Sequence, residues 1–496
     1  MNRFNLLAIL YVSSGALFYG YDSGLSTSIF GYPAFISYFN LNTTTLGAVG
    51  SCYYAGNFFG SYVNWFWPDK YGRLRTIRAA CAIAVVGAVL QTAARNLAML
   101  LVGRIVGGFA CGIIFSLCPA YASEISPPKI RGSVGGLYNL MLSSAYALTE
   151  WMGLGLSYVN GNSAWRIFLG LQFIPPALMA AGSLYMPESP RWLLLKRRDD
   201  EALEVLRKMH SDPKDPEFYL REFHQIKSQI ELERSQNRGF KTIFTKKSYI
   251  HRFVLIIAFY TFQQLTGIVP LQNYQVLLYA ALGIGNKMSL ILVGVWGMVT
   301  IISTCCGTYY FDKIGRKKSF YISITIVMIA STLLTAFWAS YEKSGNTNAT
   351  LGKLGVWSMF LFMFGYAWVM NAFGYAYIPE ICPTEIRAAG TATGLATFNA
   401  VTVLLVQVGP LAIQAISWRY FLIFLCMDAL FVPLVYFAYP ETNGKTLEEI
   451  AALFGDEVAE TMQQAEEHVH KELRNQTTGS EKIATSGLEE VDVRKV

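Results

Sequence analysis

The chain alternates between long apolar runs and short charged segments. Four of the runs contain no Asp, Glu, Lys or Arg, and they cover residues 105–123, 167–187, 253–286 and 388–418. Roughly 20 helical residues cross a hydrocarbon core of about 30 Å, so each run is long enough for a transmembrane helix. The pattern predicts an all-α membrane protein with many spans.

The apolar pattern predicts about twelve transmembrane helices. We expect them near residues 4–29, 45–67, 77–96, 98–121, 133–158, 165–186, 251–282, 288–310, 319–341, 354–380, 388–417 and 419–439. The first begins almost at Met1, contains Asp22 and lacks a cleavage site, so it is predicted to be a retained helix and not a signal peptide.

The spans fall into two groups of six separated by a charged stretch. The expected organisation is an N-terminal six-helix bundle (1–186), a cytoplasmic linker with short helices (187–250), a C-terminal six-helix bundle (251–439) and a polar cytoplasmic tail (440–496).

Two sequence motifs occur once in each group of spans. DKYGR at 69–73 recurs as DKIGR at 312–316, and EISP at 124–127 recurs as EICP at 380–383. Each copy occupies the matching place in its own group. Repeated six-helix halves around a central site are typical of carriers that work by alternating access. The repeats therefore favour a transporter over a channel or a membrane enzyme.

Composition and charge agree with this interpretation. The chain is 53% hydrophobic and 15% charged, with a net charge of +7. Its basic residues cluster in short loops at 70–78 and 313–318, which would satisfy the positive-inside rule if both loops face the cytoplasm. The charge therefore does not indicate a nucleic-acid partner.

The eight cysteines lie in or beside apolar runs without metal-ligand spacing, so we expect no metal, no cofactor and no enzymatic activity.

Further motifs complete a set that resembles the sugar porter family of the major facilitator superfamily, in its fungal-type form. They are GYD at 20–22, RIVGG at 104–108, PESPRWL at 187–193, QQLTGI at 263–268 and PETNGKTLEE at 440–449. Together with the repeats they extend in order over nearly the whole chain. The resemblance implies the major facilitator fold and alternating-access transport of a sugar or a sugar-like polyhydroxylated solute.

The repeated loops carry charged residues at the predicted cytoplasmic rim. In the family, such residues form an ion-pair network that holds the two halves together while the outside is open. The positions that match are Asp69, Arg73, Glu124, Arg131, Glu188, Arg191, Asp312, Arg316, Glu380, Arg387 and Glu441. The alternative is a set of solvated topology markers, whose exposed pairs would each contribute about 0–1 kcal/mol.

Asp22 is an acid inside an apolar helix, where it costs about 2.5–3.5 kcal/mol on insertion scales, so it should face a cavity or a partner. The resemblance implies Arg104 as that partner, the pair that links protonation to opening in proton-coupled sugar porters. Proton symport is thus expected, with a permanently ionised pair in a facilitator as the alternative.

Two other acidic residues lie within predicted spans. Glu150 is expected in the outer half of its span, in a vestibule or in contact with substrate or proton. Asp428 is expected to be a buried structural group.

Sugar recognition requires many hydrogen bonds, and side-chain amides both donate and accept them. The resemblance implies substrate contacts from Gln263, Gln264 and Tyr274. Four more positions match by counting only: Asn139, Asn273, Tyr375 and Asn399. Val269 stands where the family has an asparagine, and losing that hydrogen bond costs about 0.5–1.5 kcal/mol. The pocket therefore departs from that of a standard glucose carrier. A disaccharide, polyol, sugar acid or sugar-sized secondary metabolite is equally open.

Asn42 and Asn348 begin Asn-X-Thr sequences in predicted outer loops, so both are expected glycosylation acceptors. The expected partners are a sugar-like solute, protons and the lipid bilayer. We expect the plasma membrane, with both termini in the cytoplasm. Three alternatives remain for the function: a facilitative uniporter, an exporter or importer of a metabolite, and a sugar sensor that does not transport.

Overall fold

The computed structural model describes residues 3–126, 131–210, 218–235, 246–442, 450 and 453–455, and these residues form helices without strands. Residues 1–441 belong to one compact unit, and residues 442–496 form a second unit of which only a few residues are described. The predicted domain boundaries at 186, 250 and 439 stay predictions.

The helices of the first unit occupy all twelve predicted spans. The first half contains α1 (Arg3–Ile29), α2 (Pro33–Tyr38), α3 (Thr43–Val63), α4 (Trp67–Tyr71), α5 (Arg73–Thr92), α6 (Leu97–Ile125), α7 (Arg131–Leu156), α8 (Ser163–Leu171) and α9 (Ile174–Gly182). The linker contains α10 (Pro190–Leu195), α11 (Asp199–His210) and α12 (Phe218–Ser235). The second half contains α14 (Lys247–Gln264), α15 (Ile268–Asn273), α16 (Gln275–Ala281), α17 (Asn286–Ile314), α18 (Arg316–Lys343), α19 (Ala349–Ile381), α20 (Thr384–Ile416) and α21 (Arg419–Ala438).

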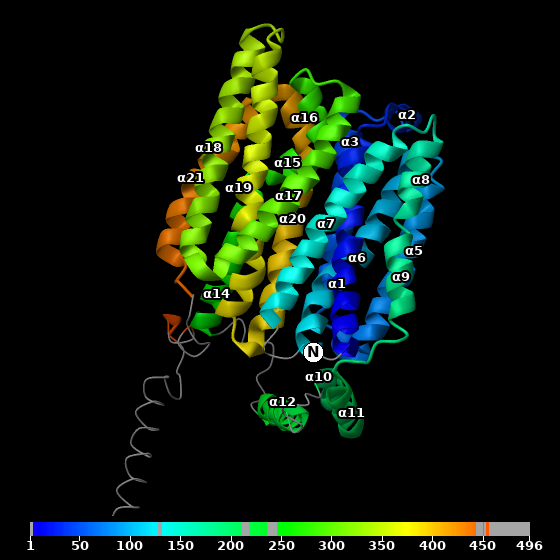
Figure 1. Cartoon of the computed structure of the whole chain (residues 1–496), viewed down its shortest axis with the longest axis vertical. Helices are drawn as coiled ribbons and strands as arrows, with labels where there is room; N and C mark the ends of the chain where they lie inside the picture. The colour runs from blue at the N-terminus through cyan, green and yellow to red at the C-terminus, as the bar shows by residue number, and fades with distance from the viewer. Residues whose placement is uncertain are drawn as a thin grey trace, which may run out of the picture. The chain divides into compact units, whose positions relative to one another are not determined.

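Two predicted spans are broken helices. The sixth span consists of α8 and α9, and the seventh consists of α14, α15 and α16. The linker helices lie at the end of the bundle where α1 begins, which we name the linker end (Figure 1). The opposite end carries α2, α16 and the turn between α18 and α19, and we name it the distal end (Figure 1).

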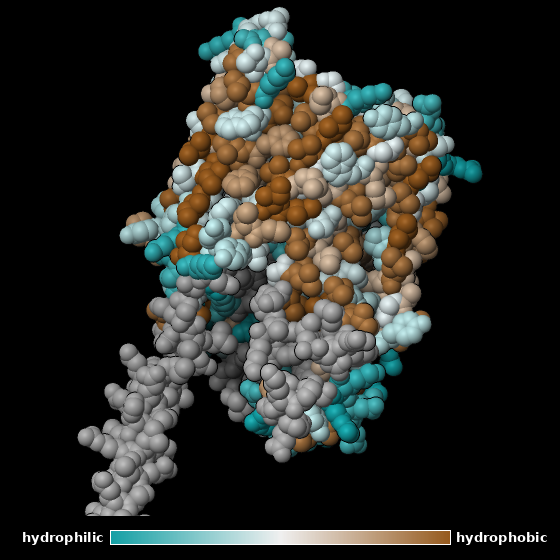
Figure 2. Space-filling view, in the orientation of Figure 1, coloured by the Kyte–Doolittle hydropathy of each residue, from teal (hydrophilic) through white to brown (hydrophobic). Residues whose placement is uncertain are grey.

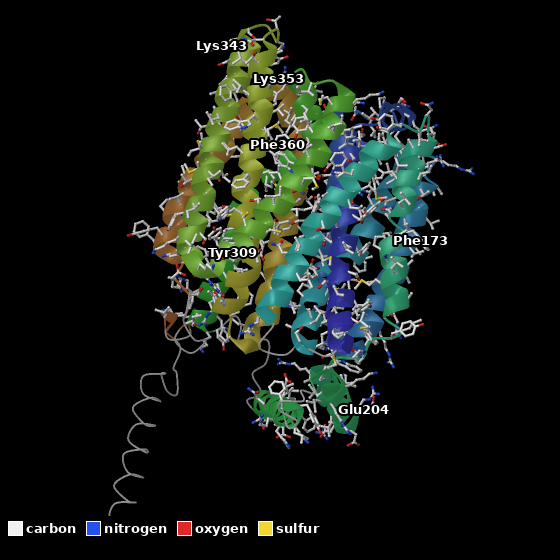
Figure 3. The ribbon with its side chains drawn as sticks, viewed as in Figure 1. Phe173, Glu204, Tyr309, Lys343, Lys353 and Phe360 are labelled. Atoms are coloured by element: carbon white, nitrogen blue, oxygen red, sulfur yellow. The ribbon has the colours of Figure 1, made fainter. Side chains whose placement is uncertain are left out.

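The outer surface of the bundle is apolar between its ends. Within the described residues, eight helical segments are long and apolar enough to cross a membrane: α5, α6, α8 with α9, α17, α18, α19, α20 and α21. Figure 2 shows apolar side chains over the helical body and polar ones at its ends. Lys343 and Lys353 lie at the distal end, Glu204 lies on the linker helices, and Phe173 and Phe360 lie between (Figure 3).

The four remaining predicted spans, α1, α3, α7 and α14 to α16, are not among these eight segments. They carry many of the buried polar side chains of the protein, including Asp22, Asn57, Glu150 and Gln264. Side chains of this kind avoid lipid because an unsatisfied polar group in hydrocarbon costs several kcal/mol. These four spans therefore face other helices and the interior.

The two halves repeat the same local structure at the linker end. Gly72 precedes α5 with φ 101°, and Gly315 precedes α18 with φ 96°, a backbone conformation that glycine adopts without strain. The predicted tight turns are present in both copies. The fold is an all-α membrane fold of two pseudo-symmetric six-helix bundles.

Inside the first half, α3 and α6 pack backbone against backbone. A Cβ atom on Gly108 of α6 would lie 2.0 Å from the carbonyl oxygen of Tyr53, and one on Gly56 of α3 would lie 2.1 Å from that of Ile105. Small residues at helix contacts allow such an approach in membrane proteins.

The halves meet mainly through two helix pairs, α3 with α20 and α7 with α17. Hydrogen bonds cross this interface towards the distal end. Ser51 donates to Gln407 at 2.7 Å, and Thr43 donates to Gln414 at 2.8 Å. The amide of Asn286 donates to the carbonyl oxygen of Gly31 at 3.0 Å. The distal end is therefore held closed in this structure.

The linker helices form a small apolar cluster of their own, which includes Leu194, Leu206, Phe223 and Ile230. Lys227 of α12 donates to Asp199 of α11 at 2.5 Å, and this contact with a carboxylate raises the pKa of the lysine.

Candidate functional site

A cavity lies between the two halves, and its wall comes from α1, α3, α7, α14, α15, α17, α19 and α20. The wall combines four tyrosines, three side-chain amides, three hydroxyl residues and five apolar side chains. They are Tyr19, Tyr54, Leu142, Ser143, Tyr146, Gln264, Ile268, Val269, Gln272, Asn273, Thr300, Met363, Tyr366, Phe398 and Thr402. None of these described lining residues is charged.

The break in the seventh span shapes one side of this cavity. α14 ends at Gln264, and Gly267 follows in the left-handed region with φ 96°. A Cβ atom on Gly267 would lie 3.0 Å from the ring of Phe424, so both the conformation and the space favour glycine. Discontinuous helices with backbone bordering a cavity are typical of transporter sites.

The predicted substrate residues of the seventh span divide into two groups. Gln264 and Asn273 line the cavity, and Val269, the apolar departure from the family, lines it as well. Gln263 is buried beside it and donates to the carbonyl oxygen of Met370 at 2.9 Å. Tyr274 turns away from the cavity and donates to the carbonyl oxygen of Val406 at 2.6 Å.

Two other positional matches, Asn139 and Asn399, are not among the described residues that line the cavity. Asn139 and Asn399 are buried, and the Asn399 amide donates to the carbonyl oxygen of Leu395 at 2.8 Å. The side chain of Tyr375 lies outside the described residues. Their roles as substrate contacts stay predictions.

Several lining residues were missed from the sequence, above all the four tyrosines. Tyr146 lies seven residues after Asn139, and therefore two helical turns along the same face of α7. That periodicity could have identified it. Tyr54 and Tyr366 had no such reference position, because a tyrosine within an apolar span is equally compatible with packing or with the lipid interface.

Asp22 of α1 and Arg104 of α6 face each other, as expected. Oδ1 of Asp22 lies 3.6 Å from Nη1 of Arg104, and the side chains are 3% and 1% exposed. Arg104 also donates from Nε to the carbonyl oxygen of Val49 at 3.1 Å, donates from Nη2 to Ser26, and stacks over the ring of Tyr53 with 4.7 Å to its centroid. One guanidinium therefore joins α1, α3 and α6.

Hydroxyl groups beside this pair are hydrogen-bonded to the cavity wall. Ser23, next to Asp22, accepts a hydrogen bond from Tyr146 at 2.7 Å and shares one with Tyr54 at 3.1 Å. Tyr54 also donates to Asn273 of the second half at 3.4 Å. Asp22 is therefore next in the chain to a serine that is hydrogen-bonded to two tyrosines of the cavity wall.

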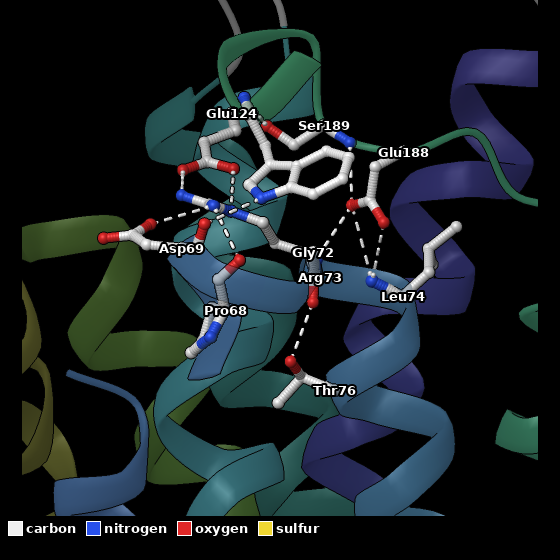
Figure 4. Close-up of polar contacts among 10 residues, drawn as sticks. Pro68, Asp69, Gly72, Arg73, Leu74, Thr76, Glu124, Glu188 and Ser189 are labelled. Carbon is white, nitrogen blue, oxygen red and sulfur yellow. Dashed lines mark hydrogen bonds and ion pairs between the residues drawn. The ribbon is translucent and has the colours of Figure 1, made fainter. Parts of the chain in front are cut away.

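The charged rim of the first half forms a connected cluster (Figure 4). Arg73 binds Glu124 through two parallel hydrogen bonds of 2.9 Å and pairs with Asp69 at 2.9 Å. Glu188 accepts from the backbone N–H groups of Arg73 and Leu74, so it caps the start of α5. Bidentate arginine–carboxylate pairs are among the stronger polar contacts in proteins.

The second half repeats this arrangement. Arg316 binds Glu380 at 2.8 Å, and Glu441 accepts from the backbone N–H groups of Arg316 and Lys317 at 3.1 and 2.9 Å. Glu188 and Glu441 thus act as equivalent caps of α5 and α18, a role that the sequence did not suggest.

Arg191 and Arg387 are two further predicted rim residues whose side chains the structure describes. Arg191 lies in the first turn of α10, and Arg387 donates to the carbonyl oxygen of Cys382 at 3.4 Å. The side chains of Arg131 and Asp312 lie outside the described residues. The pairs described above each join residues of one half. A network that joins the two halves at the linker end therefore stays a prediction for another conformation.

Asn42 and Asn348 both lie at the distal end, where each is the N-cap of a helix. Oδ1 of Asn42 accepts from the N–H of Thr45 at 2.8 Å, and that of Asn348 accepts from the N–H of Thr350 at 3.1 Å. Both residues are exposed. Glycosylation of either stays a prediction.

No metal site is apparent in the part of the chain that the structure describes, since no three His, Cys, Asp or Glu side chains cluster there.

The chain is similar to known transporters over most of its length. Residues 7–454 match the family model described as "Sugar (and other) transporter". MFS-type transporter criB from Aspergillus cristatus is 33% identical over 448 residues, which are 89% of this chain and 91% of that protein. A high-affinity glucose transporter from Kluyveromyces lactis is 28% identical over 92% of this chain and 86% of that protein.

A solved structure with a similar fold is the major facilitator proton:xylose symporter XylE bound to 6-bromo-6-deoxy-D-glucose. It has a TM-score of 0.76 and 22% sequence identity, with coverage of 91% of this chain and 99% of that one. The inward-open conformation of XylE from E. coli has a TM-score of 0.74 at 20% identity, with coverage of 91% and 100%.

Proposed function

The chain belongs to the sugar porter family of the major facilitator superfamily, as a multi-pass membrane transporter and not an enzyme, and on that premise we propose that it carries a neutral, sugar-like polyhydroxylated solute by alternating access and proton symport. The observation that carries the proposal is the cavity between the halves, where amides and hydroxyls from both sides converge.

The cavity favours a neutral solute with an apolar face. Its described lining offers amide, tyrosine and threonine groups for hydrogen bonds but no cation to bind a carboxylate. Side chains such as Val269, Met363 and Phe398 offer a surface for a ring or a hydrocarbon part. A sugar acid is therefore disfavoured among the solute classes that the sequence leaves open.

The proton-coupling proposal rests on Asp22 and Arg104. Protonation of Asp22 would remove the charge that faces Arg104, and Arg104 also binds Val49 and Tyr53 of α3. Because α3 packs on α20 of the other half, a shift of α3 would change the interface between the halves. This gives protonation a physical route to the opening of the carrier.

The rim clusters complete the proposed cycle. With the distal end closed, Arg73 and Arg316 bind carboxylates of their own halves. When the linker end closes, these clusters come together, and the remaining lone pairs of Glu124 and Glu380 can accept from the opposite half.

Orientation and location belong to the same proposal. The linker end carries the basic clusters and the distal end carries both glycosylation sequences, so we place the linker end in the cytoplasm and the carrier in the plasma membrane.

The test is uptake of labelled hexoses, pentoses, disaccharides, polyols and sugar acids in transporter-deficient cells, with and without a protonophore. Wild type should accumulate a neutral member of the panel, and both the protonophore and Asp22→Asn should abolish accumulation. Uptake that only equilibrates and ignores both treatments would make the protein a facilitator. Absence of any uptake, despite surface expression, would favour an exporter or a sensor.

A further inference from the structure

Glu150 is a buried carboxyl group at the interface between the two halves. It lies in the contact of α7 with α17, which we name the joint. It lies on α7, one helical turn after Tyr146 of the cavity wall, and its residue is only 1% exposed. Its Oε2 lies 2.4 Å from the position that a Cβ atom would take on Gly297 of α17. The carboxyl group therefore fits the joint because residue 297 has no side chain.

The surroundings of Glu150 offer no compensating charge. Oε2 accepts no hydrogen bond of good geometry, although the backbone of Gly297 lies within reach of the carboxyl group, and no described cation forms an ion pair with it. The titratable groups that interact with it are Tyr146 of its own helix and Tyr279 of α16.

Along its whole length α7 packs against α1, α6, α8, α17 and α19. α1 and α8 contribute Ser28 and Phe168 beside Gly153, one turn from Glu150. The charges inside α1 and α6, Asp22 and Arg104, pair with each other, while Arg3 and Glu124 lie in the terminal turns of these helices at the linker end. Arg166 of α8 binds Tyr38, Lys287 of α17 lies over the ring of Tyr158, and Lys353 of α19 lies at the distal end. An ionised carboxylate closed into this joint would be desolvated with the backbone of Gly297 beside it but no described cation, which is strongly unfavourable.

We propose that Glu150 is a second proton-binding site, which takes up a proton from the distal solution when the distal end closes and returns it to that side when the end opens. The inference rests on the alternating-access function proposed above. The bound form is the neutral carboxylic acid, and the free form is the carboxylate in contact with water. The joint is sealed whenever the linker end is open, so this proton is not carried across, unlike the proton assigned to Asp22.

The consequence is a linkage between distal pH and conformation. One proton taken up on closure changes the ratio of closed to open molecules by up to about tenfold per pH unit. Acidification of the distal solution therefore favours the closed distal end. Glu150→Gln mimics the protonated group and should hold the distal end closed at every pH.

The distance across the distal end tests this directly in purified full-length protein, without any substrate. Spin labels at Ser37→Cys on α2 and Lys353→Cys on α19 report on opposite halves, and both positions are exposed. Native Cys52, Cys305, Cys306 and Cys426, which are at least partly accessible, are replaced by serine. Electron-electron resonance distances are then recorded over a pH series in lipid nanodiscs.

We expect the short-distance population to grow as the pH falls, and Glu150→Gln to show it throughout. The matched control is Asp428→Asn, because Asp428 is another buried carboxyl group without partners but lies on α21, which packs within the second half. This control should retain the pH response. An unchanged response in Glu150→Gln, or the absence of any response in wild type, would overturn the proposal.

Infrared difference spectroscopy of wild type against Glu150→Gln gives a second readout. The carbonyl stretch of a protonated carboxylic acid should be missing from the variant under conditions in which wild type is closed. Identical spectra in that region would contradict the assignment. Neither measurement requires uptake. A failed uptake panel would refute the proposed substrate, while the distance and infrared measurements would still decide whether Glu150 binds a proton on closure.

Discussion

At the residue scale, α20 offers a matched pair of threonines for testing the cavity as the substrate site. Thr402 lines the cavity and lies 3.3 Å from Oε1 of Gln264, whereas Thr397 on the same helix does not line it. Both hydroxyls also donate to the carbonyl oxygen one turn earlier, at 2.7 and 2.9 Å. Replacement by valine keeps the shape of each side chain and removes only the hydroxyl group.

Thr402→Val should raise the KM for the transported solute roughly 2- to 12-fold, because one hydrogen bond contributes about 0.5–1.5 kcal/mol. Thr397→Val should leave KM unchanged. Initial rates of uptake over a concentration series measure both. Equal effects of the two variants would mean that the loss is structural and that the cavity described here is not the binding site.

Among the residues of the cavity, the sequence predicted some positions correctly and others not. Gln264 and Asn273 line the cavity where a motif and a count along the chain placed them. Tyr274 is not among the described lining residues, although it directly follows Asn273. The left-handed Gly267 and the break at Tyr274, which is the N-cap of α16, reset the helical phase and turn that tyrosine towards Val406.

At the element scale, the contact between α3 and α6 depends on the absence of side chains. Gly108→Ala would place a Cβ atom 2.0 Å from the carbonyl oxygen of Tyr53, so the two helices must move apart. Overpacking of this kind costs about 1–3 kcal/mol. We expect a lower midpoint in thermal unfolding of the detergent-solubilised protein. The displacement would also disturb Arg104, whose guanidinium stacks over Tyr53.

Gly135→Ala on α7 is the control, because a Cβ atom at that exposed position meets no described atom within 4 Å. Alanine is the better helix former by about 0.8–1.0 kcal/mol, so this variant should be as stable as wild type or slightly more stable. A similar loss of stability in both variants would indicate a general intolerance of the bundle to substitution, and the close-packing argument would be wrong.

Apolar patterning predicted the positions and order of the spans at this scale because length and lack of charge are properties of one segment. It did not predict that α8 and α9, or α14 to α16, are separate helices within one span. Those breaks depend on packing against other helices, such as Phe424 against Gly267, which no local window contains.

At the scale of the whole molecule, the polar contacts divide into two kinds. Within each half, bidentate arginine–carboxylate pairs and backbone caps fix the ends of α5 and α18. Between the halves, the contacts towards the distal end are neutral hydrogen bonds such as that of Ser51 with Gln407. Hydrogen bonds to charged groups are roughly twice as strong as neutral ones. The halves are therefore better suited to move as units than to deform.

A cross-link between the halves at the distal end tests that motion. A Cβ atom on Gly50 of α3 would lie 2.6 Å from Cγ1 of Val406 on α20, so the Cβ atoms of two cysteines there would be at most about 4 Å apart. That separation suits a disulfide. In a background with exposed Cys305 and Cys426 replaced by serine, Gly50→Cys with Val406→Cys should transport when reduced and lose at least tenfold in rate when oxidised.

Reductant should restore transport, and each single variant should ignore the oxidant. Mass spectrometry of digested protein measures the fraction cross-linked, so the residual rate can be compared with the fraction left open. If fully cross-linked protein transports at the reduced rate, the distal contacts of α3 and α20 persist through the whole cycle. Rocking of rigid halves would then be excluded, and the proton linkage inferred for Glu150 in the other contact between the halves, that of α7 with α17, would lose its physical basis.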